Sequence, residues 1–128
     1  MKTYKVTVDN HGTQRWYNEA GKLHRDDGPA FICPNGVQHW YQNNKLHRDD
    51  GPAFTCPNGE QRWYRNNKLH REDGPAIIYS DGEKKWYLEG KDYREEDYHA
   101  ELRKRAGVTS FEGKSVVIDG KTYYLREK

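Results

Sequence analysis

The chain repeats one pattern about every 23 residues. Each copy begins at a glycine, and the four glycines lie 24, 23 and 23 residues apart: Gly12, Gly36, Gly59 and Gly82. A Trp-Tyr pair follows each glycine, and three of the copies then carry Lys-Leu-His-Arg and Gly-Pro-Ala at fixed distances. A period of this length is typical of repeat proteins, in which each unit packs against its neighbours. We therefore expect an array of about four similar units.

Aliphatic residues are scarce in this chain. Leu, Ile, Val and Phe together make up 19 of its 128 residues, below the share of about 20% at which disorder is suspected. High net charge, the other sign of disorder, is missing, because 22 Lys and Arg face 20 Asp and Glu. Ten Tyr and four Trp supply the apolar area instead, and large rings of this kind suit a thin sheet that is wet on one side.

The composition also excludes several classes of protein. No stretch approaches the roughly 20 apolar residues of a membrane-spanning helix, and the first residues lack the apolar centre of a secretion signal. We therefore expect a cytoplasmic protein without a transmembrane segment. A formal net charge of +2 is too small for a dedicated binder of duplex DNA.

Each unit is predicted to form two short antiparallel strands. The Pro-Asn-Gly at 34–36 and its equivalents contain pairs that suit two-residue hairpin turns. Asn43-Asn44 and its equivalent one repeat later can form the partner turn, because Asn tolerates positive φ. The expected fold class is mainly β, an antiparallel meander of about four 23-residue, two-stranded repeats with a C-terminal helix and hairpin cap.

Two-residue turns fix which side chains share a face of the sheet. They set Phe31 opposite Trp40 across the first turn, and Trp40 opposite His47 across the second. One face then collects Trp, Phe, Cys, Gln and the His of each His-Arg, and we take it as the core face. The other face collects the tyrosines with the basic residue that precedes each Trp. The structural core of the repeats is predicted to contain Trp16, Trp40, Trp63, Trp86, His24, His47 and His70.

The fourth copy loses the pattern after Gly90, and a helix is predicted to follow. Residues 95–106 carry acids first and bases last, which suits the helix dipole. Tyr98, Leu102 and Ala106 share one helical face. Gly107 is a typical residue just after a helix end.

A final hairpin is expected about residues 119–120, with strands at 115–118 and 122–126. Terminal units of repeat proteins commonly differ from the others and close the array. We therefore divide one structural domain into a repeat array over residues 1–94 and a cap of helix plus hairpin over residues 95–128.

The 23-residue period, the turn followed by Lys-x-His, the glycine at a fixed offset and the closing Asn-Gly resemble MORN repeats and their bacterial relatives. The closer resemblance is to short phage and bacterial proteins with Trp-Tyr-x-Asn-Gly-Lys-x-His-Arg-x-Asp-Gly-Pro-Ala repeats, and residues 12–97 carry it. Asn44 and Asn67 stand where that pattern has a turn glycine, a change that the left-handed region of Asn allows. The resemblance implies an elongated β-sheet that binds proteins or membranes and has no catalytic activity.

Three His-Arg-acid-Asp segments, at 24–27, 47–50 and 70–73, combine imidazole with carboxylates, a mixture used in metal binding and acid-base chemistry. We interpret them as structural, because a residue that recurs in every unit serves contacts between units. We therefore predict no catalytic residue, no metal site, no cofactor and no enzymatic activity.

Cys33 and Cys56 occupy equivalent positions in neighbouring units. Equivalent residues two strands apart lie about 10 Å from each other, beyond the roughly 7 Å that a disulfide allows. We predict two free thiols, which agrees with a reducing compartment.

A column of basic residues accompanies the tyrosines: Arg15, His39, Arg62 and Lys85. Basic groups among rings can bind single-stranded nucleic acid or anionic lipid. Neighbouring carboxylates weaken such a field within a Debye length of about 8–10 Å. We therefore prefer a protein partner and keep a nucleic acid or an anionic membrane surface as the alternative. The predicted partner-binding residues are Tyr41, Tyr64, Tyr87, Arg62 and Lys85.

These observations lead to the hypothesis of a non-enzymatic protein that acts by covering a surface on another protein. Phage kinship, implied by the resemblance, makes the concrete version an accessory protein that inhibits a host defence or metabolic complex, such as a CRISPR effector. The sheet is also expected to have two free edges and an uncovered face, and a homodimer would cover both.

Overall fold

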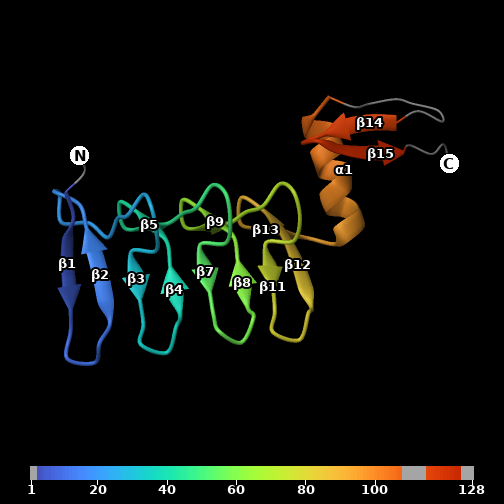
Figure 1. Ribbon diagram of the computed structural model, residues 1–128. Coiled ribbons are helices and arrows are strands. Elements are labelled where there is room, and N and C mark those ends of the chain that lie inside the picture. Colours follow the sequence, from blue (N-terminus) through green and yellow to red (C-terminus); the bar gives the residue numbers. More distant parts are fainter. Residues whose placement is uncertain (1–2, 108–114, 125–128) are drawn as a thin grey trace.

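The computed structural model describes residues 3–107 and 115–124. Strands dominate these residues and a single α-helix follows the array, so the mainly β fold class is confirmed. Figure 1 shows the hairpins side by side in one row, with the helix and a last hairpin at the C-terminal end.

A nine-stranded antiparallel sheet runs the length of the array. Its strands, in order from one edge to the other, are β1 (Lys5–Val8), β2 (Gln14–Tyr17), β3 (Phe31–Ile32), β4 (Gln38–His39), β7 (Phe54–Thr55), β8 (Gln61–Arg62), β11 (Ile77–Ile78), β12 (Lys84–Leu88) and β13 (Lys91–Tyr93). Spatial order follows chain order, with the short hairpins between β4 and β7 and between β8 and β11 left out. The predicted antiparallel meander is confirmed.

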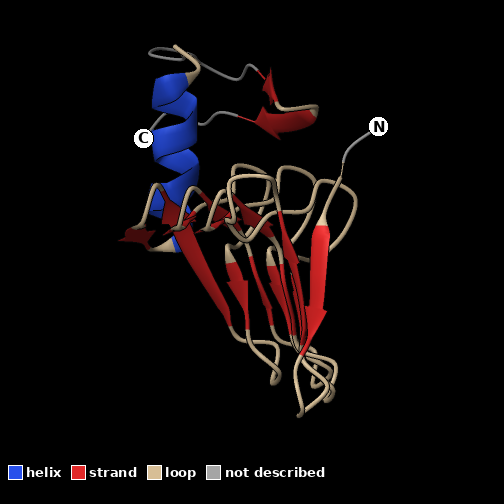
Figure 2. Cartoon of the chain, turned by 90° about the vertical axis from the view of Figure 1, so that its left-hand side faces the viewer, coloured by secondary structure: helices blue, strands red, loops and turns tan. Residues whose placement is uncertain are grey.

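The short hairpins lie past the upper ends of the main-sheet strands in Figure 1. They are formed by β5 (Tyr41–Gln42) with β6 (Lys45–Leu46), and by β9 (Tyr64–Arg65) with β10 (Lys68–Leu69). Asn43 and Asn44 make the first turn with φ of 49° and 68°, so the predicted two-residue turn is confirmed. Trp40 lies opposite His47 as predicted, because its carbonyl accepts a 3.1 Å bond from the His47 N–H. Figure 2 shows these hairpins crossing the top of the longer strands.

The turns at residues 34–36 and their equivalents, which lie at the lower ends of the strands in Figure 1, are called the lower turns. They have three residues rather than the two predicted. The N–H of Cys33 donates to the carbonyl of Val37, and that of Gly36 donates back to Cys33, both at 2.9 Å. Gly36 has φ of +95°, and a glycine in this left-handed position forms the bulge of a three-residue hairpin. The extra residue shifts the pairing by one position.

The shifted register corrects the predicted faces. Phe31 pairs with His39, not with Trp40. A one-residue slip moves a side chain to the other face of a sheet. The phenylalanines therefore lie with the basic column and not with the tryptophans, so the predicted grouping of Trp with Phe is wrong.

The Asn-Asn turns bind each unit to the one before it. Asn44 donates its N–H to the Leu23 carbonyl at 2.9 Å, and its side-chain oxygen accepts from the Leu23 N–H at 2.7 Å. Asn67 binds Leu46 in the same two ways. Gly90, at the equivalent position, makes only the backbone bond, to Leu69. Asn at this position therefore adds a hydrogen bond that the glycine of the resembling pattern lacks.

Few side chains of the array are fully buried. Ala30, Ala53 and Ala76 have no exposed surface, and each accepts a backbone hydrogen bond from a tryptophan, at 2.7–2.8 Å. The tryptophans themselves are half-buried. The repeat core is thus one residue deep, as the scarcity of aliphatic residues requires.

Helix α1 (Glu95–Arg105) begins and ends close to its predicted bounds. Tyr98 and Leu102 are buried against Leu88 of β12, whereas Ala106, expected on the same face, is exposed at the C-cap. Gly107 has φ of +78° and follows the helix as predicted.

The last hairpin joins β14 (Ser115–Ile118) and β15 (Lys121–Tyr124) about Asp119-Gly120, and its turn was predicted correctly. Residues 125–126 of the predicted second strand lie outside the described residues. The two cysteines are free, as predicted.

Candidate functional site

Directly paired residues form a line across the main sheet. In antiparallel pairs, opposite side chains point to the same face. Following the pairs from β2 to β12 gives seven residues on one face: Arg15, Phe31, His39, Phe54, Arg62, Ile77 and Lys85. Basic and apolar residues alternate strictly along this line. We call it the basic-apolar row.

Neighbours in the row touch through their rings. The guanidinium of Arg15 lies 4.9 Å from the centre of the Phe31 ring, and that of Arg62 lies 5.6 Å from the Phe54 ring. The His39 ring lies between the two phenylalanines, edge-on, at 5.2 and 5.0 Å. Cation-π and edge contacts of this kind favour one orientation of each ring. The row is therefore ordered by its own members.

Two of the predicted tyrosines join the row. The Tyr41 ring is stacked on His39 with centres 6.1 Å apart. Burial raises the pKa of the Tyr41 hydroxyl, and the neighbouring Tyr64 raises it further. Burial lowers the pKa of Arg62, but its hydrogen bond to Tyr64 and the charge of Glu60 outweigh this, so the net change is upward.

The five predicted partner-binding residues are all partly exposed. Tyr41, Tyr64 and Arg62 lie together at the row, and Lys85 ends it beside Ile77. Tyr87 pairs with Asp92 in β13.

The prediction missed the apolar half of the row, which is made by Phe31, Phe54 and Ile77. The glycine in third place fits the bulge of a three-residue hairpin, but the same Pro-Asn-Gly also fits the two-residue turn, so the sequence held no signal that decides between them.

The positive charge of the row is largely balanced. Arg62 binds Glu60 and Arg15 binds Asp9, both at 2.9 Å. The hydrogen bond from Arg15 and backbone N–H donors lower the pKa of Asp9 to about 2. Burial lowers the pKa of His39, which keeps its ring neutral at pH 7. Within the described residues, Lys85 has no carboxylate within ion-pair distance.

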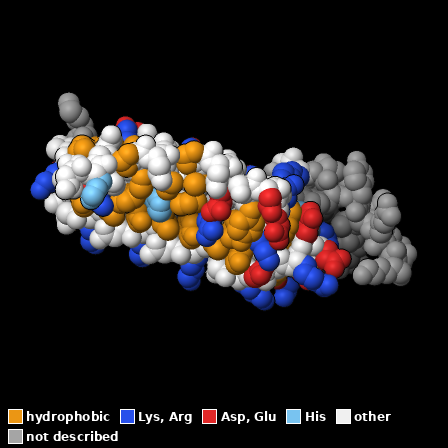
Figure 3. Space-filling model, turned by 90° about the horizontal axis from the view of Figure 1, so that it is seen from below, with side chains coloured by type: hydrophobic (Ala, Val, Ile, Leu, Met, Phe, Trp, Pro, Cys, Tyr) orange, Lys and Arg blue, Asp and Glu red, His pale blue; other side chains and the backbone are white. Residues whose placement is uncertain are grey.

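The surface seen from below in Figure 3 carries an apolar band. Figure 3 shows hydrophobic side chains gathered along the length of the array, with Lys and Arg along one side. Towards the cap, acidic and basic side chains interrupt the band. The array therefore presents a long surface that is neither wholly apolar nor strongly charged.

The His-Arg-acid segments form a second recurring arrangement. The guanidinium of Arg48 lies 3.8 Å from the Trp40 ring centre and donates to Asp50 and to the Pro52 carbonyl, both at 3.2 Å. A Cβ on Gly51 would lie 2.9 Å from the Arg48 Cζ, so any other residue would push the guanidinium out of this position. Equivalent contacts recur around Arg25 and Arg71.

The histidines of these segments connect neighbouring units. Nδ1 of His47 accepts a 3.1 Å bond from the N–H of Asn66 in the next unit, and Nε2 lies 2.8 Å from the Asp49 carboxylate. His24 and His70 make the same pair of bonds. Because Nδ1 accepts, Nε2 carries the proton and donates. Both ring nitrogens therefore serve the array.

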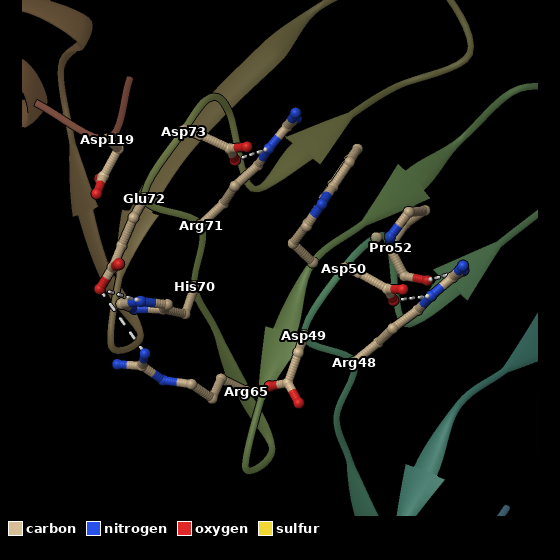
Figure 4. A pocket seen from close by; sticks show the side chains of 12 residues that line it. Arg48, Asp49, Asp50, Pro52, Arg65, His70, Arg71, Glu72, Asp73 and Asp119 are labelled. Atoms are coloured by element: carbon tan, nitrogen blue, oxygen red, sulfur yellow. Dashed lines mark hydrogen bonds and ion pairs between the residues drawn. The ribbon is translucent and has the colours of Figure 1, made fainter. Parts of the chain in front are cut away.

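The same segments line a pocket of about 530 Å³. Figure 4 shows the Arg48–Asp50 and Arg71–Asp73 pairs on its walls, and dashed lines join Glu72 to both His70 and Arg65. Equivalent residues of the preceding unit line a smaller pocket of about 340 Å³. Across residues 3–107 and 115–124, no cluster of three or more His, Cys, Asp or Glu could hold a metal ion.

Comparison with known proteins adds no assignment: the chain matches no family model, no curated protein and no solved structure. The described part of the chain contains no helix with the length and apolar character needed to cross a bilayer.

Proposed function

We propose that this protein is a non-enzymatic binding module that attaches to another protein through the basic-apolar row and the tyrosines beside it. The alternation of basic and apolar side chains along directly paired strands carries the proposal. Every member of the row except Ile77 is partly exposed. Aromatic and arginine side chains are the types most enriched where binding energy concentrates.

The row is suited to binding because its rings are already ordered. Phe31, His39 and Phe54 hold one another edge-on at 5.0–5.2 Å. Side chains that are fixed before binding lose little entropy when a partner covers them. A flat and rigid partner surface would therefore gain contacts at low cost.

The charge pattern favours a protein over a polyanion. Nucleic acids and anionic membranes bind through cations that are free to neutralise phosphates. Two of the cations in the row are already paired, Arg62 with Glu60 and Arg15 with Asp9. A protein surface with its own mixed charges can pair with both signs.

Occlusion is the mode of action that this surface supports. An extended sheet can cover a partner without any reactive group. The resemblance to phage proteins makes a host defence or metabolic complex, such as a CRISPR effector, the first partner class to test. The free thiols Cys33 and Cys56 suit a reducing cytoplasm.

Two neighbouring lysines of β12 give a matched test. Lys85 pairs with Ile77 and Lys84 with Ile78, so the two side chains point to opposite faces. Tagged wild type, Lys85→Glu, Lys84→Glu and Tyr64→Ala/Arg62→Glu are used to capture proteins from a bacterial lysate, after thermal melts show that all four fold. Wild type and Lys84→Glu should hold the same protein, and the other two should hold about tenfold less of it.

Equal capture by all four proteins, or capture by none, would overturn the proposal. The alternative is tested with a single-stranded oligonucleotide and with anionic vesicles over a salt series. Tight binding that weakens steeply with salt and is lost in Lys85→Glu would replace the protein partner by a polyanion.

A further inference from the structure

The outer edge of β1 carries unpaired backbone groups. Asp9 donates its N–H to the Thr13 carbonyl, and hydrogen-bonded pairs alternate along an antiparallel ladder. Thr7 therefore faces β2 with its backbone, whereas the N–H and C=O groups of Val6 and Val8 point outward. Within the described residues, no strand pairs with this outer side.

The two outward residues of β1 also expose apolar side chains. Val6 is 48% and Val8 is 64% exposed, and they are the large apolar residues that stand out as exposed in the described part of the chain. Proteins commonly protect an edge strand with charges, bulges or cover. An exposed pair of valines on an open edge therefore indicates a strand that is covered in use.

The sequence of β1 is complementary to itself. In an antiparallel pair, outward-facing residues must lie opposite outward-facing residues. A two-fold axis at Thr7 satisfies this condition, because it places Val6 opposite Val8 of the second copy and Lys5 opposite Asp9 of the second copy. We infer that β1 pairs in this register with β1 of another copy, which joins the two sheets into one.

Contacts at both ends of β1 fix the position of this strand. The Tyr4 hydroxyl donates to the Asp26 carboxylate and accepts from the Asp26 N–H, at 3.2 and 3.1 Å, which fixes the start of β1. Asp9 is ionised beside Arg15, and Lys5 of the second copy would lie next to the same carboxylate as a second cation. Four backbone hydrogen bonds, two valine pairs and two charge pairs form a small interface, which is typical of reversible association.

Such a pair would extend the basic-apolar row. Thr7 lies opposite Arg15 and so belongs to the same line as the row. At the axis, Thr7 lies opposite Thr7 of the second copy, and the rows of the two copies become collinear on one face. The pairing itself does not depend on the proposed function, because cross-linking reports self-association and lysate capture reports the partner.

Disulfide trapping tests the register. The background is Cys33→Ser/Cys56→Ser, which removes both natural thiols. Thr7→Cys places two thiols across a non-hydrogen-bonded pair with Cα atoms about 4.5 Å apart, within disulfide range. Thr3→Cys is the matched control, because Thr3 is exposed, lies before β1 and belongs to none of the proposed pairs, and its equivalent on the second copy would lie more than about 20 Å away. Under mild oxidation, Thr7→Cys should form covalent dimer about tenfold faster than Thr3→Cys.

Equal cross-linking of the two variants, or faster cross-linking of Val6→Cys, would overturn the register. Sedimentation gives a second measurement that needs no cysteine. Val8→Lys should lower the dimer fraction while Val8→Thr retains it, and the exposure of Val8 lets both variants fold. A wild-type protein that stays monomeric at the highest soluble concentration would overturn the inference itself.

Discussion

In the repeat units and at the C-terminal end, different side chains cover the face of the tryptophan ring. Inside the array, a cation covers each tryptophan, as Arg48 covers Trp40 at 3.8 Å. At the end, Trp86 is covered instead by Tyr98, whose ring centre lies 4.9 Å away. Tyr98 is fully buried against Leu88 of the fourth unit, whereas the side chains without exposed surface in the described part of the first three units are alanines.

The difference follows from the absence of a next unit. Arg94 stands 23 residues after Arg71, at the equivalent position of the fourth unit. It binds Asp97 at 2.8 Å on the surface instead of covering Trp86, and Tyr98 takes the place over that ring. The Tyr98 hydroxyl donates to the Arg71 carbonyl and accepts from the Gly74 N–H. A unit that relies on its neighbour for hydrogen bonds must be closed by another element where the neighbours stop.

Removing the Tyr98 ring should have the largest effect on stability. Tyr98→Ala should lower the free energy of unfolding by about 3–5 kcal/mol, the usual cost of deleting a buried aromatic ring. Tyr98→Phe keeps the ring and loses only the hydroxyl bonds, so its cost should be about 1 kcal/mol. Urea denaturation measures both values, and equal costs for the two variants would show that the ring does not close the array.

Adding a methyl group at Gly51, against the Arg48 guanidinium, should have the next largest effect on stability. Gly51→Ala places Cβ against Arg48 and should cost about 1–3 kcal/mol through overpacking. In an Arg48→Ala background the clash is absent, so the cost of the same change should fall by more than half. A cost that is unchanged in that background would mean that the glycine serves the backbone and not the guanidinium.

Exchanging the turn residues of the two regions should give smaller and opposite effects. Asn67→Gly removes the acceptor for the Leu46 N–H and should cost about 0.5–1.5 kcal/mol. Gly90→Asn offers the same acceptor to Leu69 and should add stability, because a Cβ has room there and Asn enters the left-handed region that Gly90 adopts at φ +83°, as Asn67 does at φ 69°. Thermal melts of the two variants should shift in opposite directions, and shifts of the same sign would contradict the Asn role.

The smallest expected effect is on the pH dependence of stability, through His70, which binds Glu89 of the last unit. Burial and the charge of Arg65 lower the pKa of His70 below 6.5, and Glu72 and Glu89 offset only part of this. The unfolded chain therefore takes up the proton first, so stability is complete above pH 6.5 and falls as the pH drops towards the lowered pKa. Unfolding free energies at pH 7.5 and 5.5 should differ more for wild type than for His70→Gln, and identical differences would contradict this role.

Local chemistry made much of the fold predictable. The Asn43-Asn44 turn, the helix with its terminal glycine and the last hairpin were each predicted from residues next to one another in the sequence. The lower turns were not, since Pro-Asn-Gly fits a two-residue and a three-residue hairpin alike, and only the backbone bonds of Cys33 decide between them.

The third residue of these turns accounts for the wrong face assigned to the phenylalanines of the candidate site. A slip of one position moved Phe31 and Phe54 to the wrong face, although His39 and Arg62 had been grouped with the tyrosines correctly. The stacking of arginine on tryptophan was also out of reach, because each arginine lies in a segment outside the strands and meets its tryptophan only where the chain folds back.

Side-chain footprinting of the protein alone and in complex with its captured partner shows whether the basic-apolar row is the binding face. Phe31, Phe54 and Tyr64 should become protected from labelling in the complex, while Ile32 and Ile78, on the opposite face of the sheet, should label as before. Protection of Ile32 and Ile78 with unchanged labelling of the row would show that the row is not the binding face.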